Sequence, residues 1–356
     1  SANRWQQKSL AVHWRCTVLV SHLNAGKKEK RMSILGLDIG YSNLKLAYGE
    51  KEQTPKTILR PSGAAPADRF GARFDGKAHD DFLRVLVDGE EFVAGVSPDR
   101  AEMWTRSLHE DYTASQSYKA LFHAGLLLTE AQKIDTLVTG LPVSQFFDEK
   151  RKAALVKQMT GEHQITPKRT VTVENVKVIP QPVGGLLDFI SQENPEDIED
   201  ARVLVIDPGF FSVDWVVSSN FDLHRQSSGT SLEASSVVLE EASRLISKDY
   251  GSQINTETLE NAIRHSKKNV LVMGERVELS DYIEQATKTI GPVVIEKVRK
   301  ALRAESKGID LVVLVGGGAM FFRDAVEQVF PRLKVITPDQ SVFSNAKGFW
   351  IMGAAQ

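Results

Sequence analysis

The sequence predicts an α/β protein of two similar domains, each with a mixed sheet and flanking helices. An apolar strand that ends in Asp, a Gly-containing turn and a second apolar run occurs twice, at 37–45 and at 206–214. Strands and then helices follow each copy in the same order, which indicates a pseudo-repeat rather than a short-period solenoid. The chain has 356 residues, enough for about two domains with a substantial apolar core.

The first half begins as an antiparallel meander. Two strands from Ser33 to about Gly49 flank the first turn, and residues 82–87 and 92–94 form a hairpin. A helical face at 115–131 followed by the apolar run 134–140 implies parallel pairing with the earlier strands. The other elements expected in this half are a helix at about 148–160, a strand pair at 170–180 and a helix opened by Pro182.

The second half repeats this order. Strands at 202–207 and 213–219 flank the second turn, and a further strand follows. The later elements are expected to be helices at about 231–249, 256–266 and 280–305, a buried strand at 310–315 and a last helix at about 341–354. This last helix should pack back across the junction. The first domain is therefore drawn as 32–182 plus 341–356, and the second as 183–340.

Residues 1–31 differ from the body in charge. They carry seven Lys or Arg and one Glu, which leaves 37 basic and 45 acidic residues after them. Met32 directly precedes the first strand, so a disordered or vector-derived leader is expected, and it contains the only cysteine, Cys16. Its apolar runs are too short to span a membrane. An acidic body repels nucleic acid, so we expect no direct DNA binding. Because the apolar runs are short and no cysteine follows residue 31, we expect no membrane contact and a cytoplasmic location.

Both turns have a chemistry that suits phosphate. A Gly-containing turn lets backbone N–H groups approach phosphate oxygens, and an Asp at the strand end can hold the water shell of Mg²⁺. Either turn alone is typical of an ordinary hairpin, but the recurrence favours two facing turns that bind the phosphates of one nucleotide. Lys45 could place a charge near the phosphates or be an exposed strand residue. Asp214 could be structural or act directly.

Two further segments fit such a site. The buried strand 311–315 runs into the glycine triplet 316–318 and then a helix, where a flat ring or a phosphate could lie against the backbone. Gln181 stands between two prolines at a strand-to-helix joint. Such a joint can hold the side chain against an attacking water, or the Gln can cap the helix.

In this order the four segments resemble the actin-like ATPase superfamily, which includes actin, the heat-shock chaperone ATPases and sugar kinases. The likeness is strongest to plasmid-segregating bacterial actins of the ParM/StbA type, whose first loop has the form Asp-x-Gly-x-x-Asn-hydrophobic-Lys. The residues that match this form are Asp38, Gly40, Asn43, Leu44 and Lys45. The segments 139–143 and 343–353 also look like that family. The chain departs from it at Phe210, where Gly is usual, and at Gln181, where some relatives place Glu.

The resemblance implies two ribonuclease-H-like domains, with mixed five-stranded sheets, around a nucleotide cleft. ATP or GTP with Mg²⁺ is the expected cofactor. Asp38 and Asp207 would hold the metal through water, and Gln181 with Asp207 would orient the attacking water. The residues expected to bind the nucleotide are Asp38, Gly40, Tyr41, Ser42, Asn43, Lys45, Gly209, Phe210, Phe211, Ser212, Gly316, Gly317 and Gly318.

The function implied by the resemblance is a filament-forming ATPase that segregates or positions plasmid DNA in the cytoplasm of a bacterium. Head-to-tail self-association would build the filament, and a DNA-binding adaptor protein would link it to its cargo. The alternative is a kinase for a sugar or small acid on the same fold. That reaction needs an Asp base in the cleft, and the nearest candidate, Asp148, looks like a helix N-cap or first-turn acid. Base recognition is expected in the helices near 231–268.

Overall fold

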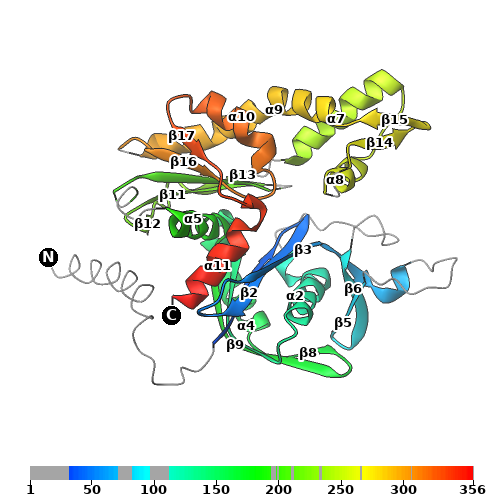
Figure 1. Ribbon diagram of the computed structural model, residues 1–356, viewed down its shortest axis with the longest axis vertical. Coiled ribbons are helices and arrows are strands. Elements are labelled where there is room, and N and C mark those ends of the chain that lie inside the picture. The colour runs from blue at the N-terminus through cyan, green and yellow to red at the C-terminus, as the bar shows by residue number, and fades with distance from the viewer. Residues whose placement is uncertain are drawn as a thin grey trace.

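Two mixed sheets, each with its own helices, form the two halves of the molecule (Figure 1). The structure, a computed structural model, describes residues 32–70, 82–96, 112–193, 198, 200–209, 212–231, 235–264, 267–305 and 307–355. The expected leader 1–31 with Cys16, and the expected site residues Phe210 and Phe211, lie outside the described residues. The expected fold class, an α/β protein of two similar domains, is confirmed.

The first sheet has six strands rather than the expected five, in the order β3-β2-β1-β7-β9-β8. Its strands are β1 (Ser33–Ile39), β2 (Asn43–Glu50), β3 (Lys56–Pro61), β7 (Lys133–Leu141), β8 (Gly161–Thr166) and β9 (Arg169–Pro180). The meander β1-β2-β3 is antiparallel, and β7 pairs in parallel with β1, as expected. The sixth strand, β8, adds to the edge of β9 in the antiparallel direction.

The strand pair expected at 170–180 is wrong, because β9 is one strand of 12 residues. The polar pair Glu174-Asn175 suggests a turn in the sequence. In the structure both side chains find partners on β7 instead: Lys133 Nζ lies 2.5 Å from a Glu174 oxygen, and Asn175 Nδ2 donates to the carbonyl of Asp135 at 3.0 Å. These contacts let polar residues continue the strand.

Among the described residues, a small sheet and three α-helices complete the first domain. The small sheet consists of β4 (Gly63–Pro66), β5 (Leu83–Val87) and β6 (Glu90–Val96), and the helices are α2 (Gln116–Leu128), α3 (Val143–Phe146) and α4 (Glu149–Met159). Asp148 is the N-cap of α4 and accepts hydrogen bonds from the backbone N–H groups of Lys150 and Arg151. That capping role is the one the sequence suggested for it.

The second sheet also has six strands, with β12-β11-β10-β16-β17 in order and β13 paired to β11. Its strands are β10 (Val203–Pro208), β11 (Val213–Ser219), β12 (Asp222–Leu223), β13 (Gly229–Ser231), β16 (Leu311–Leu314) and β17 (Lys334–Ile336). Its helices are α7 (Ser235–Tyr250), α8 (Thr256–Arg264), α9 (Ser280–Ala301) and α10 (Ala319–Val329). A hairpin that the sequence did not predict, β14 (Asn269–Val272) and β15 (Glu275–Glu278), joins α8 to α9.

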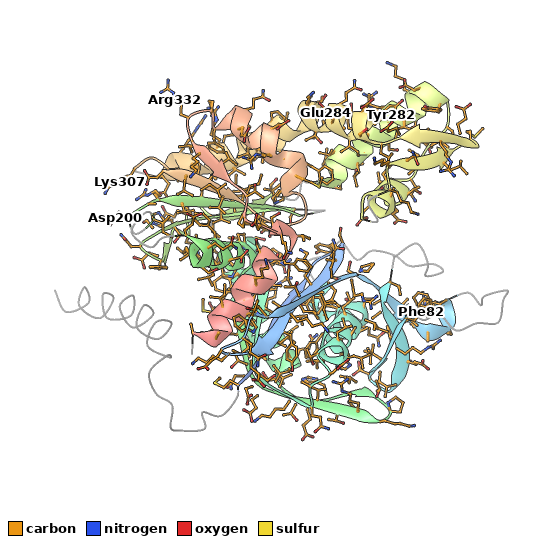
Figure 2. The ribbon with its side chains drawn as sticks, in the orientation of Figure 1. Phe82, Asp200, Tyr282, Glu284, Lys307 and Arg332 are labelled. Carbon is orange, nitrogen blue, oxygen red and sulfur yellow. The ribbon has the colours of Figure 1, made fainter. Side chains whose placement is uncertain are left out.

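Two helices, α5 (Gln181–Gln192) and α11 (Ser344–Ala354), lie between the sheets (Figure 1). They touch closely, because a Cβ on Gly348 of α11 would lie 1.7 Å from the carbonyl oxygen of Gly184 in α5. On the other side, α11 packs on β1 at Gly36, and α5 packs on Val315 of the second domain through Gly185. The last helix thus packs back across the junction, as expected. Figure 2 shows the side chains of the two domains above and below this junction. The domain boundaries at 182/183 and 340/341 stay predictions.

Across the described ranges, no helix combines the length and apolar character needed to cross a bilayer.

Candidate functional site

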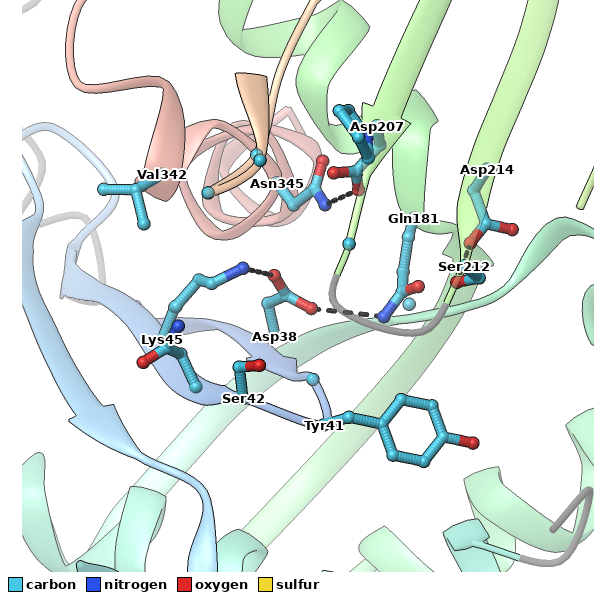
Figure 3. Close-up of a pocket in the computed structure, with 18 of the residues that line it drawn as sticks. Asp38, Tyr41, Ser42, Lys45, Gln181, Asp207, Ser212, Asp214, Val342 and Asn345 are labelled. Carbon is cyan, nitrogen blue, oxygen red and sulfur yellow. Dashed lines mark hydrogen bonds and ion pairs between the residues drawn. The ribbon is translucent and has the colours of Figure 1, made fainter. Parts of the chain in front are cut away.

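A cleft of about 550 Å³ lies between the two domains. The two Asp-x-Gly turns, the Gln181 joint and the glycine triplet all contribute to its wall (Figure 3). Every site residue predicted from the sequence that the structure describes lines this cleft. The structure therefore brings the four segments together, as expected if both turns bind the same nucleotide.

The first turn places two charges face to face. Asp38 is the penultimate residue of β1 and is 2% exposed, and Lys45 is its direct partner on β2. Lys45 Nζ lies 3.0 Å from Asp38 Oδ2, so the alternative of an exposed strand lysine is wrong. Burial alone would lower the pKa of Lys45, but the nearby charges of Asp38 and Asp207 outweigh it and raise the pKa. The ammonium therefore stays charged inside the cleft.

The other oxygen of Asp38 reaches the Gln181 joint. Gln181 begins α5, and its Nε2 donates to Asp38 Oδ1 at 3.2 Å (Figure 3). The helix-capping alternative for Gln181 is not what the structure shows, because α5 has no side-chain cap hydrogen bond. A side-chain amide is thus held across the floor of the cleft next to a carboxylate.

The second turn repeats the first. Gly209 N–H donates to the carbonyl of Ser212 at 2.7 Å, just as Gly40 N–H donates to that of Asn43 at 2.9 Å. Asp207 accepts a 2.6 Å hydrogen bond from Asn345 Nδ2 on α11. Burial raises the pKa of Asp207 to about 7, although the charge of Lys45 works in the opposite direction.

The glycine triplet packs on the second turn. Gly316 has φ +82, and a Cβ there would lie 2.0 Å from Asp207 Oδ1. A Cβ on Gly318 would lie 2.2 Å from the carbonyl oxygen of Pro208, whereas Gly317 has only a Val342 methyl at 3.8 Å. Gly318 is needed so that two backbone segments can approach closely, and Gly316 so that the Asp207 carboxylate can lie against the backbone. Only Gly317 of the three has room beside it for a ring or a phosphate.

Asp214, whose role the sequence left open, ties the two domains together. It is buried and accepts hydrogen bonds from Val143 N at 2.9 Å, Ser212 Oγ at 2.9 Å and Thr230 Oγ1 at 2.5 Å. Burial raises its pKa, and these three donors oppose the rise. Asp214 is therefore at least a structural link between the loop after β7 and strands β11 and β13.

Several cleft residues were missed at the sequence level. Glu260 of α8 is 6% exposed, and Ser42 Oγ donates to its Oε1 across the cleft at 2.7 Å. The Tyr41 ring stacks on Tyr112 with centroids 4.6 Å apart. Asn345 could have been found from its place in the family-like segment 343–353. Glu260 and Tyr112 carried no such signal, because each is an ordinary residue of a helical or loop segment.

The donors in this cleft fit a magnesium nucleotide. Asp38 and Asp207 supply the hard oxygen ligands that Mg²⁺ prefers, and Lys45 supplies a cation for phosphate. The side-chain oxygens of Asn43 and Asn345 are buried there without a hydrogen-bond partner, so both can accept a hydrogen bond from a ligand or its water shell. In the part of the chain that the structure describes, no group of three or more His, Cys, Asp or Glu could ligate a metal directly.

Known proteins resemble both halves of the chain. Residues 36–184 match the family model of the N-terminal domain of actin-like proteins, and residues 205–328 match that of the C-terminal part of archaeal MreB-like actin homologues. No curated protein matches the sequence.

Solved structures share the fold. The archaeal actin homologue Ta0583 superposes with a TM-score of 0.73 at 22% identity, over 91% of this chain and 100% of that one. Its complex with ADP gives 0.72 at 22% identity, over 91% and 100% of the two chains. A 15-stranded ParM filament from Clostridium botulinum gives 0.71 at 18% identity, over 91% and 99%.

Proposed function

Because the chain is an actin-like protein, by its fold and by the family models that match its two halves, we propose that it is a filament-forming nucleoside triphosphatase. It binds ATP or GTP with Mg²⁺ in the cleft, hydrolyses it, and uses the filament to position plasmid DNA through an adaptor protein. The observation that supports this most directly is the pair of buried carboxylates, Asp38 and Asp207, that two like-built turns direct into one cleft beside Lys45.

Each part of the proposed site has a role that its chemistry allows. Lys45 and the two turns face the phosphates, and Asp38 and Asp207 hold the water shell of Mg²⁺. Bound Mg²⁺ supplies positive charge for the phosphoryl oxygens. Gln181 Nε2 donates to Asp38, which leaves the side-chain carbonyl oxygen of Gln181 to accept a hydrogen bond from the attacking water. Asp207 helps to orient the same water.

We place the base in the part of the cleft that the second domain forms. Its wall there is largely apolar, with Leu239 from α7, Ile283 from α9 and Phe321 from α10. Glu260 is the polar group of that wall, so it is suited to accept hydrogen bonds from hydroxyl or amino groups of the nucleotide. Its helix lies within the 231–268 region expected from the sequence.

Related structures support the two remaining parts of the proposal. ADP is bound in a complex of the archaeal homologue, and a ParM relative forms a filament. The body of this chain is acidic, so contact with DNA is assigned to an adaptor. A bacterial cytoplasmic location and the plasmid cargo stay predictions.

No observation favours the kinase alternative. A kinase needs a carboxylate in the cleft that accepts the proton of a substrate hydroxyl. Asp214 is a further carboxylate of the cleft wall, and it already accepts three hydrogen bonds. Phosphate release without any added acceptor separates the two functions, since a kinase would need the acceptor.

The test is nucleotide-dependent pelleting and phosphate release with wild type and Asp207→Ala. We expect wild type to pellet with ATP or GTP and Mg²⁺, and the variant to bind nucleotide while hydrolysing it about 100-fold more slowly. Asp148→Ala, which removes a carboxylate from the surface cap of α4, is the matched control and should hydrolyse normally. Wild type that binds no magnesium nucleotide in a calorimeter would exclude the proposal.

A further inference from the structure

The second domain has exposed apolar side chains on two hairpin turns. In β14–β15, Leu271 is 68% exposed and Met273 79% exposed. At the turn between β11 and β12, Phe221 is 63% exposed. These three are among the few large apolar side chains that are strongly exposed in the described residues, and none of them lines the cleft. Covering these side chains with a partner would remove apolar surface from water, which is favourable.

The β14–β15 hairpin is built to project its apolar residues outward. Its inner face is buried through Val270, Val272 and Val277, which join the core of the domain. Leu271 alternates with these residues and so points to the opposite face, and Met273 follows in the turn between the strands. Met273 at φ +50 and Gly274 at φ +86 form a tight turn of the kind that holds two strands rigidly. The exposed pair is therefore presented on a firm support.

The other turn carries an unfavourable residue. Asn220 and Phe221 have φ of +52 and +65, in the left-handed region. Asn tolerates that conformation well, but a bulky aromatic residue does not. Phe221 is thus both strained and exposed in a single copy of the chain. A second copy that covers its ring would offset both costs.

The two turns lie at opposite ends of the second domain. Strand β10 ends at Pro208 in the cleft, and β11 runs antiparallel to it, so the turn after Ser219 is at the end of the sheet remote from the cleft. Figure 1 places β12 at one end of the domain and β14 and β15 at the other, and Asp200 lies near the first of these ends in Figure 2. Surfaces at opposite ends can join successive copies without closing a ring.

Charge distinguishes the two ends in a complementary way. Arg276 is the cross-strand partner of Leu271, and Asp222 follows Phe221 directly. Both side chains are exposed, and neither has an ion-pair partner among the described residues. An apolar contact at one end thus has a cation beside it, and the apolar contact at the other end has an anion.

We propose that the β14–β15 turn of one copy packs on the β11–β12 turn of a second copy, with Leu271 and Met273 against Phe221 and Arg276 near Asp222. The inference rests on the proposed filament function and assigns its longitudinal contact. It is heterologous, so each copy uses the hairpin at one end and the Phe221 turn at the other.

Pelleting with magnesium nucleotide tests the contact. Leu271→Ser with Met273→Ser should raise the critical concentration for assembly at least about tenfold, while the nucleotide affinity stays as in wild type. Phe221→Asn should raise it similarly, although Asn suits the left-handed turn and should not destabilise the fold. Val293→Ser is the matched control, because Val293 is 60% exposed on α9 and lies outside the proposed contact.

Charge reversal tests whether Arg276 of one copy lies near Asp222 of the next. Arg276→Glu and Asp222→Lys should each weaken assembly, and the double variant should recover most of the loss. A mixture of two variants tests the pairing further: the hairpin variant, which carries Leu271→Ser and Met273→Ser, and the Phe221→Asn variant. These two blocked variants should form a one-to-one dimer in the analytical ultracentrifuge, because each keeps one of the two contact surfaces intact. Each variant alone should stay monomeric.

The outcomes separate this inference from the proposed function. If wild type assembles with nucleotide and the blocked variants assemble at the same concentration, the contact is elsewhere and only the inference fails. A blocked mixture that stays monomeric also overturns it. If wild type binds nucleotide yet never assembles, both the inference and the filament proposal fail.

Discussion

Gly316 is the residue of the cleft with the least room for change. Its φ of +82 and the 2.0 Å that would separate an added Cβ from Asp207 Oδ1 each exclude a larger residue. Gly317, the next residue, has neither constraint. Two adjacent glycines therefore differ in what they contribute, although the sequence shows them as equivalent.

Gly316→Ala should lower the free energy of unfolding by about 1 to 3 kcal/mol, because the methyl group meets a buried carboxylate in a left-handed backbone. Displacement of Asp207 should also slow nucleotide hydrolysis, as expected for Asp207→Ala. Urea unfolding and phosphate release measure the two effects. Gly317→Ala is the matched control, and a loss of equal size there would contradict the assignment.

At the scale of elements, the contact between α5 and α11 links the two domains. A Cβ on Gly348 would meet the backbone of Gly184 at 1.7 Å, and a backbone cannot move aside as a flexible side chain can. The pair of helices thus depends on missing side chains for its close approach. Small residues here have a packing function rather than a turn function.

Gly348→Ala should therefore separate α11 from α5 and lower the free energy of unfolding by about 1 to 3 kcal/mol. Thermal or urea unfolding is the measurement. Gly308→Ala serves as control, because a Cβ there meets nothing within 4 Å. Equal stability of the two variants would show that the helices can separate at no cost.

Buried histidines give the first domain a pH dependence. His123 of α2 and His163 of β8 have ring centroids 5.6 Å apart, and Lys119 and Asp88 are the charged groups near His123. Burial lowers the pKa of His123 to about 4 and also lowers that of His163. Between pH 6.5 and about pH 4, His123 is therefore mostly protonated in the unfolded chain and mostly neutral in the folded protein.

The free energy of unfolding should accordingly fall by about 2 kcal/mol between about pH 7.5 and about pH 5, through His123 alone. The loss begins as the pH drops below the unfolded value of 6.5 and levels off below the folded value of about 4. Urea unfolding at several pH values measures it, and NMR titration of the His123 ring checks the midpoint. A slope that is unchanged in His123→Asn would contradict this cause.

At the scale of the whole molecule, a direct hydrogen bond spans the cleft away from the helical junction. Ser42 belongs to the first turn and Glu260 to α8 of the second domain, and 2.7 Å separates their oxygens. The junction at α5 and α11 and this bond hold the cleft from two sides. Loss of the bond should favour an open cleft.

Ser42→Ala should speed nucleotide release about fivefold, the effect of one hydrogen bond of about 1 kcal/mol, and Glu260→Ala should speed it more, because it also removes the acceptor proposed for the nucleotide. The double variant should release nucleotide no faster than Glu260→Ala, because the Ser42–Glu260 bond is already lost there. Stopped-flow release of a fluorescent nucleotide measures this cycle. Ser117→Ala removes a hydroxyl that donates within the first domain, to Ala64, and should leave the rate unchanged.

The sequence by itself determined the local units of this protein. Asp38 and Asp207 could be placed at strand ends, and Asp148 at a helix start, because turn chemistry, apolar alternation and caps depend on neighbours along the chain. The repeated turn also pointed to two domains with one shared cleft. The family-like segments extended this to the nucleotide, the metal and the residues expected to bind them.

Only the tertiary structure decided which distant residues meet. Glu260 lies 218 positions from Ser42, and Asn345 lies 138 positions from Asp207, so no local pattern could pair them. Strand β17 has three residues and β14 four, too few to show a period. The unequal roles of the three glycines likewise follow from the backbone of the second turn against which they pack. Such contacts depend on where the folded chain brings its segments together, which periodicity along the sequence does not record.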